Sequence, residues 1–189
     1  MSLSRRALIG IAGGAIATGF ATRITAAVAA PAVIGVKQLN VRTLSFDCTN
    51  AGEKLHNATY WVEGSYVPEV LEKINHALRD WRANEVHPIH VGVLDLLYGL
   101  GRSLDTDCHF ELTCGYRSPR TNAMLHALDS EVATHSLHMT GQATDITLPG
   151  RPLNRLHEAA LAMQLGGVGY YPDDNFIHVD VGRVRRWQG

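Results

Sequence analysis

The sequence predicts an α+β domain over residues 39–189, in which a small antiparallel sheet is flanked by helices. Short runs rich in β-branched and aromatic residues alternate with longer segments whose apolar residues recur at helical spacing. Apolar residues make up 46% and charged residues 19% of the 189-residue chain, which is the composition of a globular protein with a substantial core. Because this region contains no internal repeat, a single domain is expected.

The first half of the domain is predicted to contain a hairpin and two helices. Residues 39–46 and 59–62 have strand composition, and an Asn-Ala-Gly-Glu segment between them is typical of a turn. Pro68 is suited to the first turn of a helix, and the apolar residues after it keep helical spacing as far as Trp81. The same spacing predicts a second helix over residues 91–104.

The second half is predicted to alternate strands with helices. A short strand, residues 110–114, leads into a Gly-Tyr-Arg-Ser segment, and Ser118 before Pro119 is a typical cap for a helix that ends at Leu128. The later elements are expected as a strand over 143–148, a helix over 153–165, and strands over 168–171 and 176–181. A Pro-Asp-Asp-Asn turn separates the last two strands.

The N-terminus has the pattern of an export signal. Paired arginines, Arg5-Arg6, directly precede residues 7–22, which are largely apolar, rich in Gly and Ala, and uncharged. An Ala-Val-Ala triplet farther on supplies the small residues of a cleavage site. We therefore predict a twin-arginine-type signal peptide over residues 1–29, a linker over 30–38, and an exported, periplasmic domain without stable membrane insertion after cleavage. A Sec-type signal and a retained membrane anchor are the alternatives.

Charge and cysteine content exclude several classes of protein. The net charge of -1 gives no basic surplus for nucleic acid, and signal cleavage would make the domain mildly acidic because it removes three arginines and no acid. Cys48, Cys108 and Cys114 form no Cys-x-x-Cys pair, so neither a zinc ribbon nor a thioredoxin-type redox site is expected. Their pairing is open.

Histidine is abundant, with ten in the chain, and two segments place histidines near aspartates. A catalytic zinc needs three protein ligands and one open position, and His138, Asp145 and His178 meet that requirement. Gly141 permits a sharp turn between the first two of these residues. Because side chains alternate along a strand, His178 and Asp180 should point the same way.

The remaining histidines are expected to have structural or surface roles. His135 lies three residues before His138, so it either supports the site through a hydrogen bond or is exposed to solvent. The histidines predicted to lie outside any site are His56, His76, His87, His90, His109, His126 and His157.

Three motifs, in the same order as in a known family, resemble a zinc peptidase. The run from Ser136 to Asp145 matches Ser-x-His-x-x-Gly-x-Ala-x-Asp, the signature of the superfamily of zinc D-Ala-D-Ala carboxypeptidases and murein endopeptidases, which includes the Hedgehog signalling domain. The Gly-Tyr-Arg-Ser element precedes that signature in many members. The ending over residues 166–187 resembles the YcbK/MepK-like branch of exported murein endopeptidases. The resemblance implies a Hedgehog/D-Ala-D-Ala-peptidase-like fold.

This resemblance also implies one Zn²⁺ per chain and a set of ligands. His138 and Asp145 occupy the ligand positions of the motif. Many relatives end in a His-x-His pair whose second histidine binds the metal, whereas this chain has Asp180 there. We expect His178 to be the third ligand, because His-Asp-His is the set that the superfamily uses, with Asp180 acting in catalysis or in support of the ligand. The alternative exchanges these two roles.

Two residues are expected to act in catalysis. Asp180 would take a proton from the attacking water and pass it to the leaving amine. Arg117 would stabilise the oxyanion or hold a substrate carboxylate, because its planar fork suits bidentate contact. Asp173 and Asp174 precede His178, but neither matches the spacing of the general base in relatives.

The implied function is a zinc-dependent murein endopeptidase that cleaves the stem-peptide cross-links of peptidoglycan. A D,D- or L,D-carboxypeptidase on the same substrate is an alternative, because it would use the same metal apparatus. A third interpretation is a zinc-containing domain that binds cell-wall peptides without cleaving them. Metal storage or sensing is a fourth, and it would require a metal shell made entirely of protein ligands.

Overall fold

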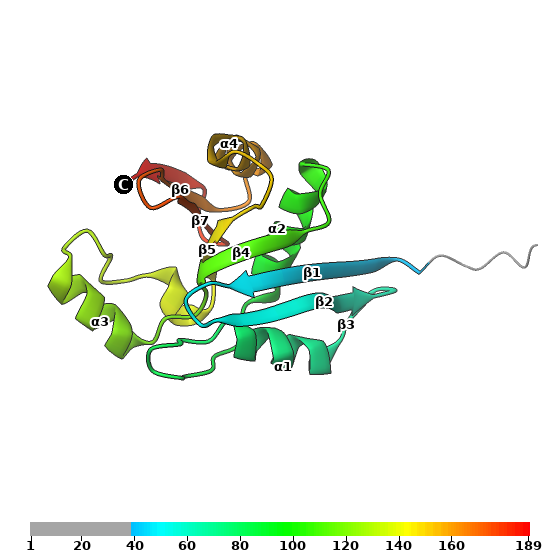
Figure 1. Cartoon of the computed structure of the whole chain (residues 1–189), viewed down its shortest axis with the longest axis horizontal. Coiled ribbons are helices and arrows are strands. Elements are labelled where there is room, and N and C mark those ends of the chain that lie inside the picture. The colour runs from blue at the N-terminus through cyan, green and yellow to red at the C-terminus, as the bar shows by residue number, and fades with distance from the viewer. Residues whose placement is uncertain (1–38) are drawn as a thin grey trace, which may run out of the picture. The chain divides into compact units, whose positions relative to one another are not determined.

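The computed structural model describes residues 39–189 (Figure 1). The predicted signal peptide, residues 1–29, and the predicted linker, residues 30–38, lie outside the described residues. Within the described part of the chain, no helix has the length and apolar character needed to cross a membrane.

The prediction of an α+β domain is confirmed over the described residues. Most predicted elements form within a few residues of their expected bounds, and two short strands, β3 and β8, were not predicted. The strands are β1 Val41–Cys48, β2 Glu53–Val62, β3 Ser65–Tyr66, β4 His109–Cys114, β5 Ala143–Thr147, β6 Gly167–Tyr171, β7 Phe176–Asp180 and β8 Arg185–Gln188. The helices are α1 Pro68–Ala77, α2 Val91–Ser103, α3 Pro119–Leu128 and α4 Leu153–Met163, with a 3-10 turn, η1, over Leu137–Thr140.

The sheet is larger than predicted, and it is mixed rather than antiparallel. Its eight strands follow the order β3-β2-β1-β4-β5-β7-β6-β8. β1 pairs with β4 in parallel, and β6 pairs with β8 in parallel, while the other pairs are antiparallel. The parallel β1–β4 pair requires a long crossover, which α1 and α2 supply. Strand composition carries no information on the pairing partner, so the sequence did not reveal this arrangement.

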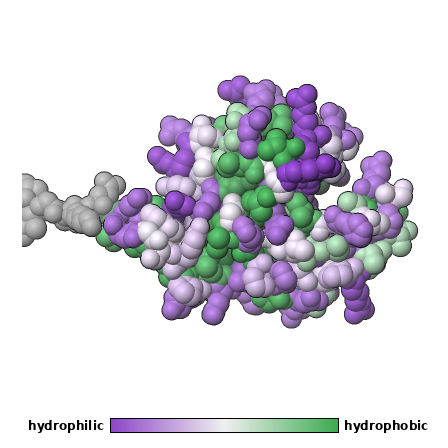
Figure 2. Space-filling view, turned by 180° about the vertical axis from the view of Figure 1, so that it is seen from behind, coloured by the Kyte–Doolittle hydropathy of each residue, from purple (hydrophilic) through white to green (hydrophobic). Residues whose placement is uncertain are grey.

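One face of the sheet is covered by helices, and part of the other is open. On β1, Leu44 and Phe46 are fully buried, while Asp47 between Phe46 and Cys48 points to the opposite face. Helices α1, α2 and α4 pack against the sheet, and α2 lies behind β1 and β4 in Figure 1. Figure 2 shows that the side with α2 carries intermixed polar and apolar side chains.

A buried aspartate joins the end of α1 to the start of α3. The Asp80 carboxylate accepts hydrogen bonds from the amides of Arg82 and Ala83 through Oδ1, and from the Ser118 amide through Oδ2 at 2.9 Å. Ser118 caps α3 as predicted, because its Oγ accepts a hydrogen bond from the Thr121 amide. α1 ends at Ala77, before the predicted Trp81, where the turn around Asp80 begins. These bonds fix the segment that carries Arg117.

Candidate metal centre

The turn that carries His138 is built by three local features. The Ser136 Oγ accepts a hydrogen bond from the His138 amide at 3.3 Å, at the start of η1. Gly141 then ends the turn with φ of 64°, and a Cβ there would meet the carbonyl oxygen of Pro88 at 2.2 Å. Only glycine fits this position. The result is that the His138 imidazole is buried, with 2% of the residue exposed.

The three predicted ligands converge on one point. Asp145 on β5 is paired in register with His178 on β7, so their side chains are neighbours on one face of the sheet. The His138 Nε2 lies 3.1 Å from the Asp145 Oδ1 and 3.1 Å from the His178 Nδ1. The His178 Nδ1 lies 2.9 Å from the same Asp145 oxygen. All three residues are buried.

The second nitrogen of each imidazole is held by the protein. The His138 Nδ1 lies 2.7 Å from the Gly115 carbonyl oxygen, which can only accept a hydrogen bond, so this nitrogen carries the proton. The His178 Nε2 likewise donates to the Asp180 Oδ2 at 3.0 Å. In the neutral tautomers, the lone pairs of His138 Nε2 and His178 Nδ1 therefore both point toward Asp145 Oδ1.

This donor set fits a zinc ion. Two imidazole nitrogens and one carboxylate oxygen are typical zinc ligands, and tetrahedral binding would place them about 3.3–3.5 Å apart. The observed separations of 2.9–3.1 Å require only small shifts. Three lone-pair atoms that face one another repel each other unless a cation or proton lies between them.

Electrostatics in this cluster also favour a cation. Burial raises the pKa of the Asp145 carboxyl, but the contacts with His138 and His178 outweigh it and leave the pKa well below its usual value. Burial lowers the pKa of His138, but the contacts with Asp145 and the neighbouring Cys114 raise it by more, so the pKa of His138 lies above its usual value. A bound metal ion would take the place of that proton.

Asp180 lies behind His178 and does not line the cleft. It is fully buried. Its Oδ1 accepts hydrogen bonds from the amides of Gly167 at 3.0 Å and Gly182 at 2.8 Å, and its Oδ2 is 2.7 Å from the Arg185 Nη2 and 3.0 Å from the His178 Nε2. Burial raises the pKa of Asp180, but these donors outweigh it and hold the pKa well below its usual value. Both carboxylate oxygens are thus occupied by donors, and Asp180 contacts His178 through Nε2 and not through the Nδ1 that faces Asp145.

Arg117 reaches the metal centre from the Gly-Tyr-Arg-Ser segment. Its amide donates to the His138 carbonyl oxygen at 3.1 Å, which ties the two predicted site segments together. The Nη2 lies 3.8 Å from the Asp145 Oδ2, and the Nη1 donates to the Asn122 side chain at 3.4 Å. The buried Nε has no hydrogen-bond partner within the described residues. The guanidinium therefore keeps an unused donor at Nε, while its Nη2 lies beside Asp145.

Cys114 is a neighbour of the metal centre that the sequence analysis missed. Its Sγ and ligand atoms of His138 and Asp145 all lie within 4.8 Å of one another, and it accepts a hydrogen bond from the Arg117 Nη2 at 3.5 Å. The register of β4 shifts between Leu112 and Cys114, so that Cys114 pairs with Asp145. This bulge is a property of strand pairing, and the sequence offers no signal for it. The three cysteines are free thiols.

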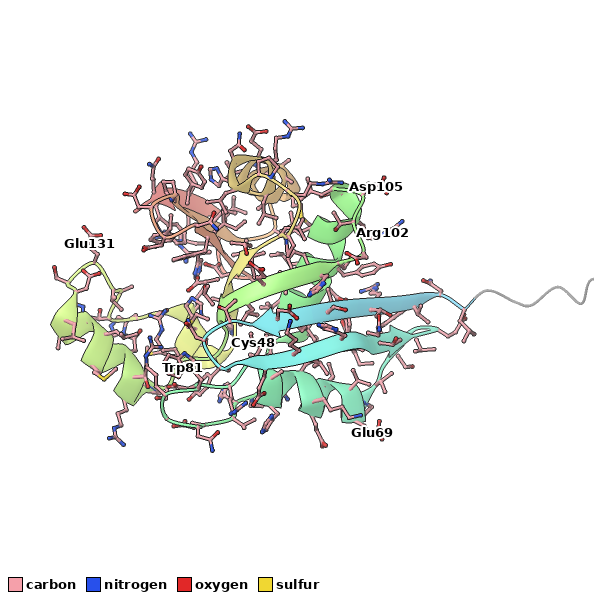
Figure 3. All side chains as sticks on the ribbon, viewed as in Figure 1. Cys48, Glu69, Trp81, Arg102, Asp105 and Glu131 are labelled. Atoms are coloured by element: carbon pink, nitrogen blue, oxygen red, sulfur yellow. The ribbon has the colours of Figure 1, made fainter. Side chains whose placement is uncertain are left out.

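The ligands open onto a cleft with a volume of about 740 Å³. Three acidic side chains that line it, Asp129, Glu131 and Asp174, were not predicted as site residues; Figure 3 shows Glu131 in the loop that follows α3. The ring of Trp187 lies 5.2 Å from the His178 ring, and its Nε1 donates to the Tyr171 hydroxyl at 2.8 Å. The cleft is lined by Arg117, His138, Asp145 and His178, and further by Asp129, Glu131, His135, Tyr171, Asp174, Phe176, Arg185 and Trp187, among others.

A comparison with known protein families assigns the chain. The family model described as "Peptidoglycan L,D-endopeptidase MepK" matches residues 36–187, which span every described element up to Trp187. The chain belongs to the MepK family. This membership confirms the resemblance that the three motifs predicted, and the ligand segments and the Arg117 segment all lie within the match.

Curated members of the MepK family are similar to the chain over most of its length. Peptidoglycan L,D-endopeptidase MepK of Escherichia coli K12 is 39% identical over 184 residues, which cover 97% of each chain. The probable peptidoglycan L,D-endopeptidase MepK of Haemophilus influenzae is 39% identical over 149 residues, or 78% of this chain and 80% of the relative. No solved structure matches, so the expected likeness to the Hedgehog domain stays a prediction.

Proposed function

We propose that the chain is a metal-dependent peptidoglycan endopeptidase that cleaves an L,D peptide bond in stem-peptide cross-links. The observation that supports this most directly is the convergence of His138, Asp145 and His178 within 3.1 Å at the cleft of a MepK-family chain. The metal is proposed to be one Zn²⁺, held by these three residues with its open position toward the cleft. Stem peptides of peptidoglycan are the proposed partner, and nucleic acid is not.

The metal and the residues around it have different roles in the proposed reaction. A bound Zn²⁺ acidifies water and polarises the scissile carbonyl. His138, Asp145 and His178 hold the ion, and the Gly115 carbonyl and the Asp180 carboxylate keep the two imidazoles oriented. Arg117 is proposed to stabilise the developing oxyanion or to hold a substrate carboxylate, because its Nε is unpaired and its Nη2 lies beside Asp145.

We propose that Asp180 positions His178 rather than accepting the proton of the attacking water. Five hydrogen bonds from Gly167, His178, Gly182 and Arg185 occupy both oxygens, and the depressed pKa of Asp180 makes it a poor base. The proton acceptor is instead proposed to be one of the carboxylates that line the cleft, namely Asp129, Glu131 or Asp174.

The side chains of the cleft suit a zwitterionic peptide. Arg117 offers a cation for a substrate carboxylate, and the three cleft acids offer partners for free amines. Stem peptides joined through diaminopimelate residues carry both kinds of group. The rings of Tyr171, Phe176 and Trp187 border the same cleft and supply apolar contact area.

Residues 1–29 are proposed to be a twin-arginine-type signal peptide, residues 30–38 a linker and residues 39–189 the peptidase domain. Cleavage of the signal would release the enzyme into the periplasm, where peptidoglycan is accessible. Mass spectrometry of the N-terminus of the protein recovered from the periplasm would test the cleavage site. An intact N-terminus on membrane-bound protein would instead establish an anchor.

A digest of cross-linked muropeptides tests the proposed activity. The zinc-loaded full chain is expected to convert cross-linked dimers to monomers, seen by chromatography with mass spectrometry, and a chelator should stop the reaction until zinc is restored. The His138→Ala variant should be inactive, while His157→Ala, which changes a histidine stacked on Tyr170 outside the cleft, should cleave normally. Release of terminal residues alone would establish a carboxypeptidase. No cleavage by protein whose cleft site holds zinc would leave a binding domain.

A further inference from the structure

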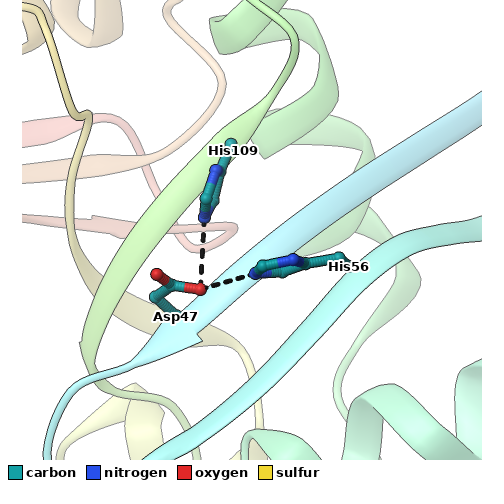
Figure 4. Close-up of side chains that lie close together, drawn as sticks. All are labelled: Asp47, His56 and His109. Carbon is teal, nitrogen blue, oxygen red and sulfur yellow. Dashed lines mark hydrogen bonds and ion pairs between the residues drawn. The ribbon is translucent and has the colours of Figure 1, made fainter.

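A second group of histidines and aspartate lies on the open face of the sheet, away from the cleft. Asp47 on β1 lies between His56 on β2 and His109 on β4 (Figure 4). We call these three residues the outer cluster. None of them lines the cleft. Both histidines were expected from the sequence to have surface or structural roles.

The strand register explains why these three side chains meet. On β1, Asp47 pairs with Lys54 of β2 and with Glu111 of β4. His56 and His109 each lie two residues from those partners, so they occupy diagonal positions on the same face. Glu111 in turn pairs with Thr147, which lies two residues from Asp145 on β5. The outer cluster and the metal centre therefore share one face of the sheet.

One carboxylate oxygen faces both imidazoles. The Asp47 Oδ1 lies 2.7 Å from the His56 Nε2 and 3.3 Å from the His109 Nε2. The two histidine rings meet edge to face, with centroids 5.0 Å apart. The ligand atoms of the three residues all lie within 4.8 Å of one another, so a small inward movement of the side chains would let one ion contact all three.

Two further observations distinguish the cluster from a chance surface contact. The His109 Nε2 is inaccessible to solvent, and its 3.3 Å contact with the Asp47 Oδ1, drawn as a dashed line in Figure 4, lacks the geometry of a hydrogen bond. A buried nitrogen without a partner is costly, and a metal ion would relieve that cost by taking its lone pair. The other Asp47 oxygen, Oδ2, is bound by the Lys54 ammonium at 2.8 Å, which orients the carboxylate with Oδ1 toward the histidines.

We propose that the outer cluster is a second binding site for a divalent transition-metal ion, with His56, His109 and Asp47 as protein ligands and solvent completing the shell. Two imidazoles and one carboxylate suit zinc and its neighbours in the first transition series. Binding requires the His56 ring to retreat by roughly 0.6 Å, to the separation of about 3.3 Å that tetrahedral ligands adopt. His56 can move because nearly half of its side chain, 46%, is exposed.

An ion at this position would join three strands. β1 and β2 form the N-terminal hairpin, whereas β4 enters the sheet after both α1 and α2. The ion would thus connect β4 to a hairpin that lies more than fifty residues earlier in the chain; Asp47 and His109, for example, are 62 residues apart. Bound metal is therefore expected to raise the thermal unfolding temperature of the full chain.

Zinc stoichiometry of the full chain tests the proposal. Isothermal titration of the metal-free protein with Zn²⁺, checked by elemental analysis after gel filtration, should give two equivalents for the wild type. His56→Ala and His109→Ala should each give one equivalent and keep full peptidase activity. His76→Ala is the matched control, because this exposed histidine lies outside both clusters, and it should keep two equivalents.

The test also separates this site from the cleft. His138→Ala should lose the cleft equivalent and retain the one bound by the outer cluster, and zinc should still raise its unfolding temperature. In crystals grown with Zn²⁺, anomalous scattering should place an ion between Asp47 and the two histidines. The proposal would be overturned if His56→Ala and His109→Ala still bound two zinc equivalents. It would also be overturned if the wild type bound a single zinc equivalent that His138→Ala lost. Neither result would contradict the proposed peptidase activity.

Discussion

The metal centre and the outer cluster are made of the same residue types on the same sheet face, yet they are held differently. In the metal centre each imidazole is fixed at its far nitrogen, by the Gly115 carbonyl for His138 and by Asp180 for His178. Within residues 39–189, no hydrogen bond holds the far nitrogen of either histidine in the outer cluster. The difference indicates that burial and outer hydrogen bonds, rather than donor chemistry, set how rigid a site is.

The largest expected effect comes from removing a ligand of the rigid site. His138→Ala should abolish zinc binding in the cleft and lower endopeptidase activity by more than about 100-fold, beyond the usual effect of outer-shell changes. His56→Ala, the equivalent truncation in the outer cluster, should leave activity unchanged. Muropeptide digestion by the two variants measures the comparison. Comparable losses of activity in both would show that the clusters are not independent.

Arg117→Lys should reduce kcat without loss of zinc. Lysine keeps the charge but cannot direct the fork of Nε and Nη donors at the site, and loss of one oxyanion donor costs about 10²–10³ in kcat. Steady-state kinetics on a cross-linked muropeptide, together with zinc analysis, check this outcome. Zinc loss in Arg117→Lys would reveal instead a role in holding Asp145, which lies 3.8 Å from the guanidinium.

Asp180→Asn should weaken zinc binding by about 10–100-fold, because the proton on His178 Nε2 would lose its charged acceptor. Activity should recover at high zinc concentration. If Asp180 were the proton acceptor, added zinc would not restore the activity of this variant. Asp173→Asn is the matched control, since this neighbouring acid does not line the cleft. Activity that stays low in zinc-saturated Asp180→Asn would return Asp180 to the catalytic role expected from the sequence.

The smallest expected effect concerns stability at acid pH. Asp180 has a folded-state pKa below its usual value, so it stabilises the fold above the unfolded pKa of about 3.9, and this contribution is lost as pH falls through the folded pKa. Thermal melts below that pH should show a shallower decline for Asp180→Asn than for the wild type. Asp47→Asn should change the decline less, because its partners are largely exposed. An equal change in the acid decline of the two variants would contradict the expected difference between the buried metal centre and the exposed outer cluster.

Spacing within two segments, together with the family motif, predicts the ligand set, and the structure brings His138, Asp145 and His178 together, while their role as zinc ligands stays a prediction. His138 and Asp145 flank a glycine turn, and the alternation of β7 predicts that His178 and Asp180 share a face, which their 3.0 Å contact confirms. The same alternation cannot tell which of the two faces the metal. The amides of Gly167 and Gly182 donate hydrogen bonds to Asp180. These donors come next to Asp180 only when β6 and β7 pair in the folded protein.

What the sequence could not reveal depends on pairing between distant strands. The parallel β1–β4 pair brings His109 to Asp47, although a strand pattern does not name its partner. The bulge in β4 turns Cys114 toward Asp145 by the same kind of pairing. Even so, local signals such as the Ser118 cap and the Gly141 turn were read correctly, because their partners lie within a few residues.

The close packing of Trp187 over β6 gives the metal centre an optical probe. Gly169 pairs with both His178 and Trp187, and a Cβ at Gly169 would lie 2.6 Å from the indole, so glycine lets the ring settle beside His178. Trp61 and Trp81 lie outside the cleft. Fluorescence of Trp187 should therefore respond when Co²⁺ or Cu²⁺ replaces zinc, and the protein can report occupancy of its own site without an added label.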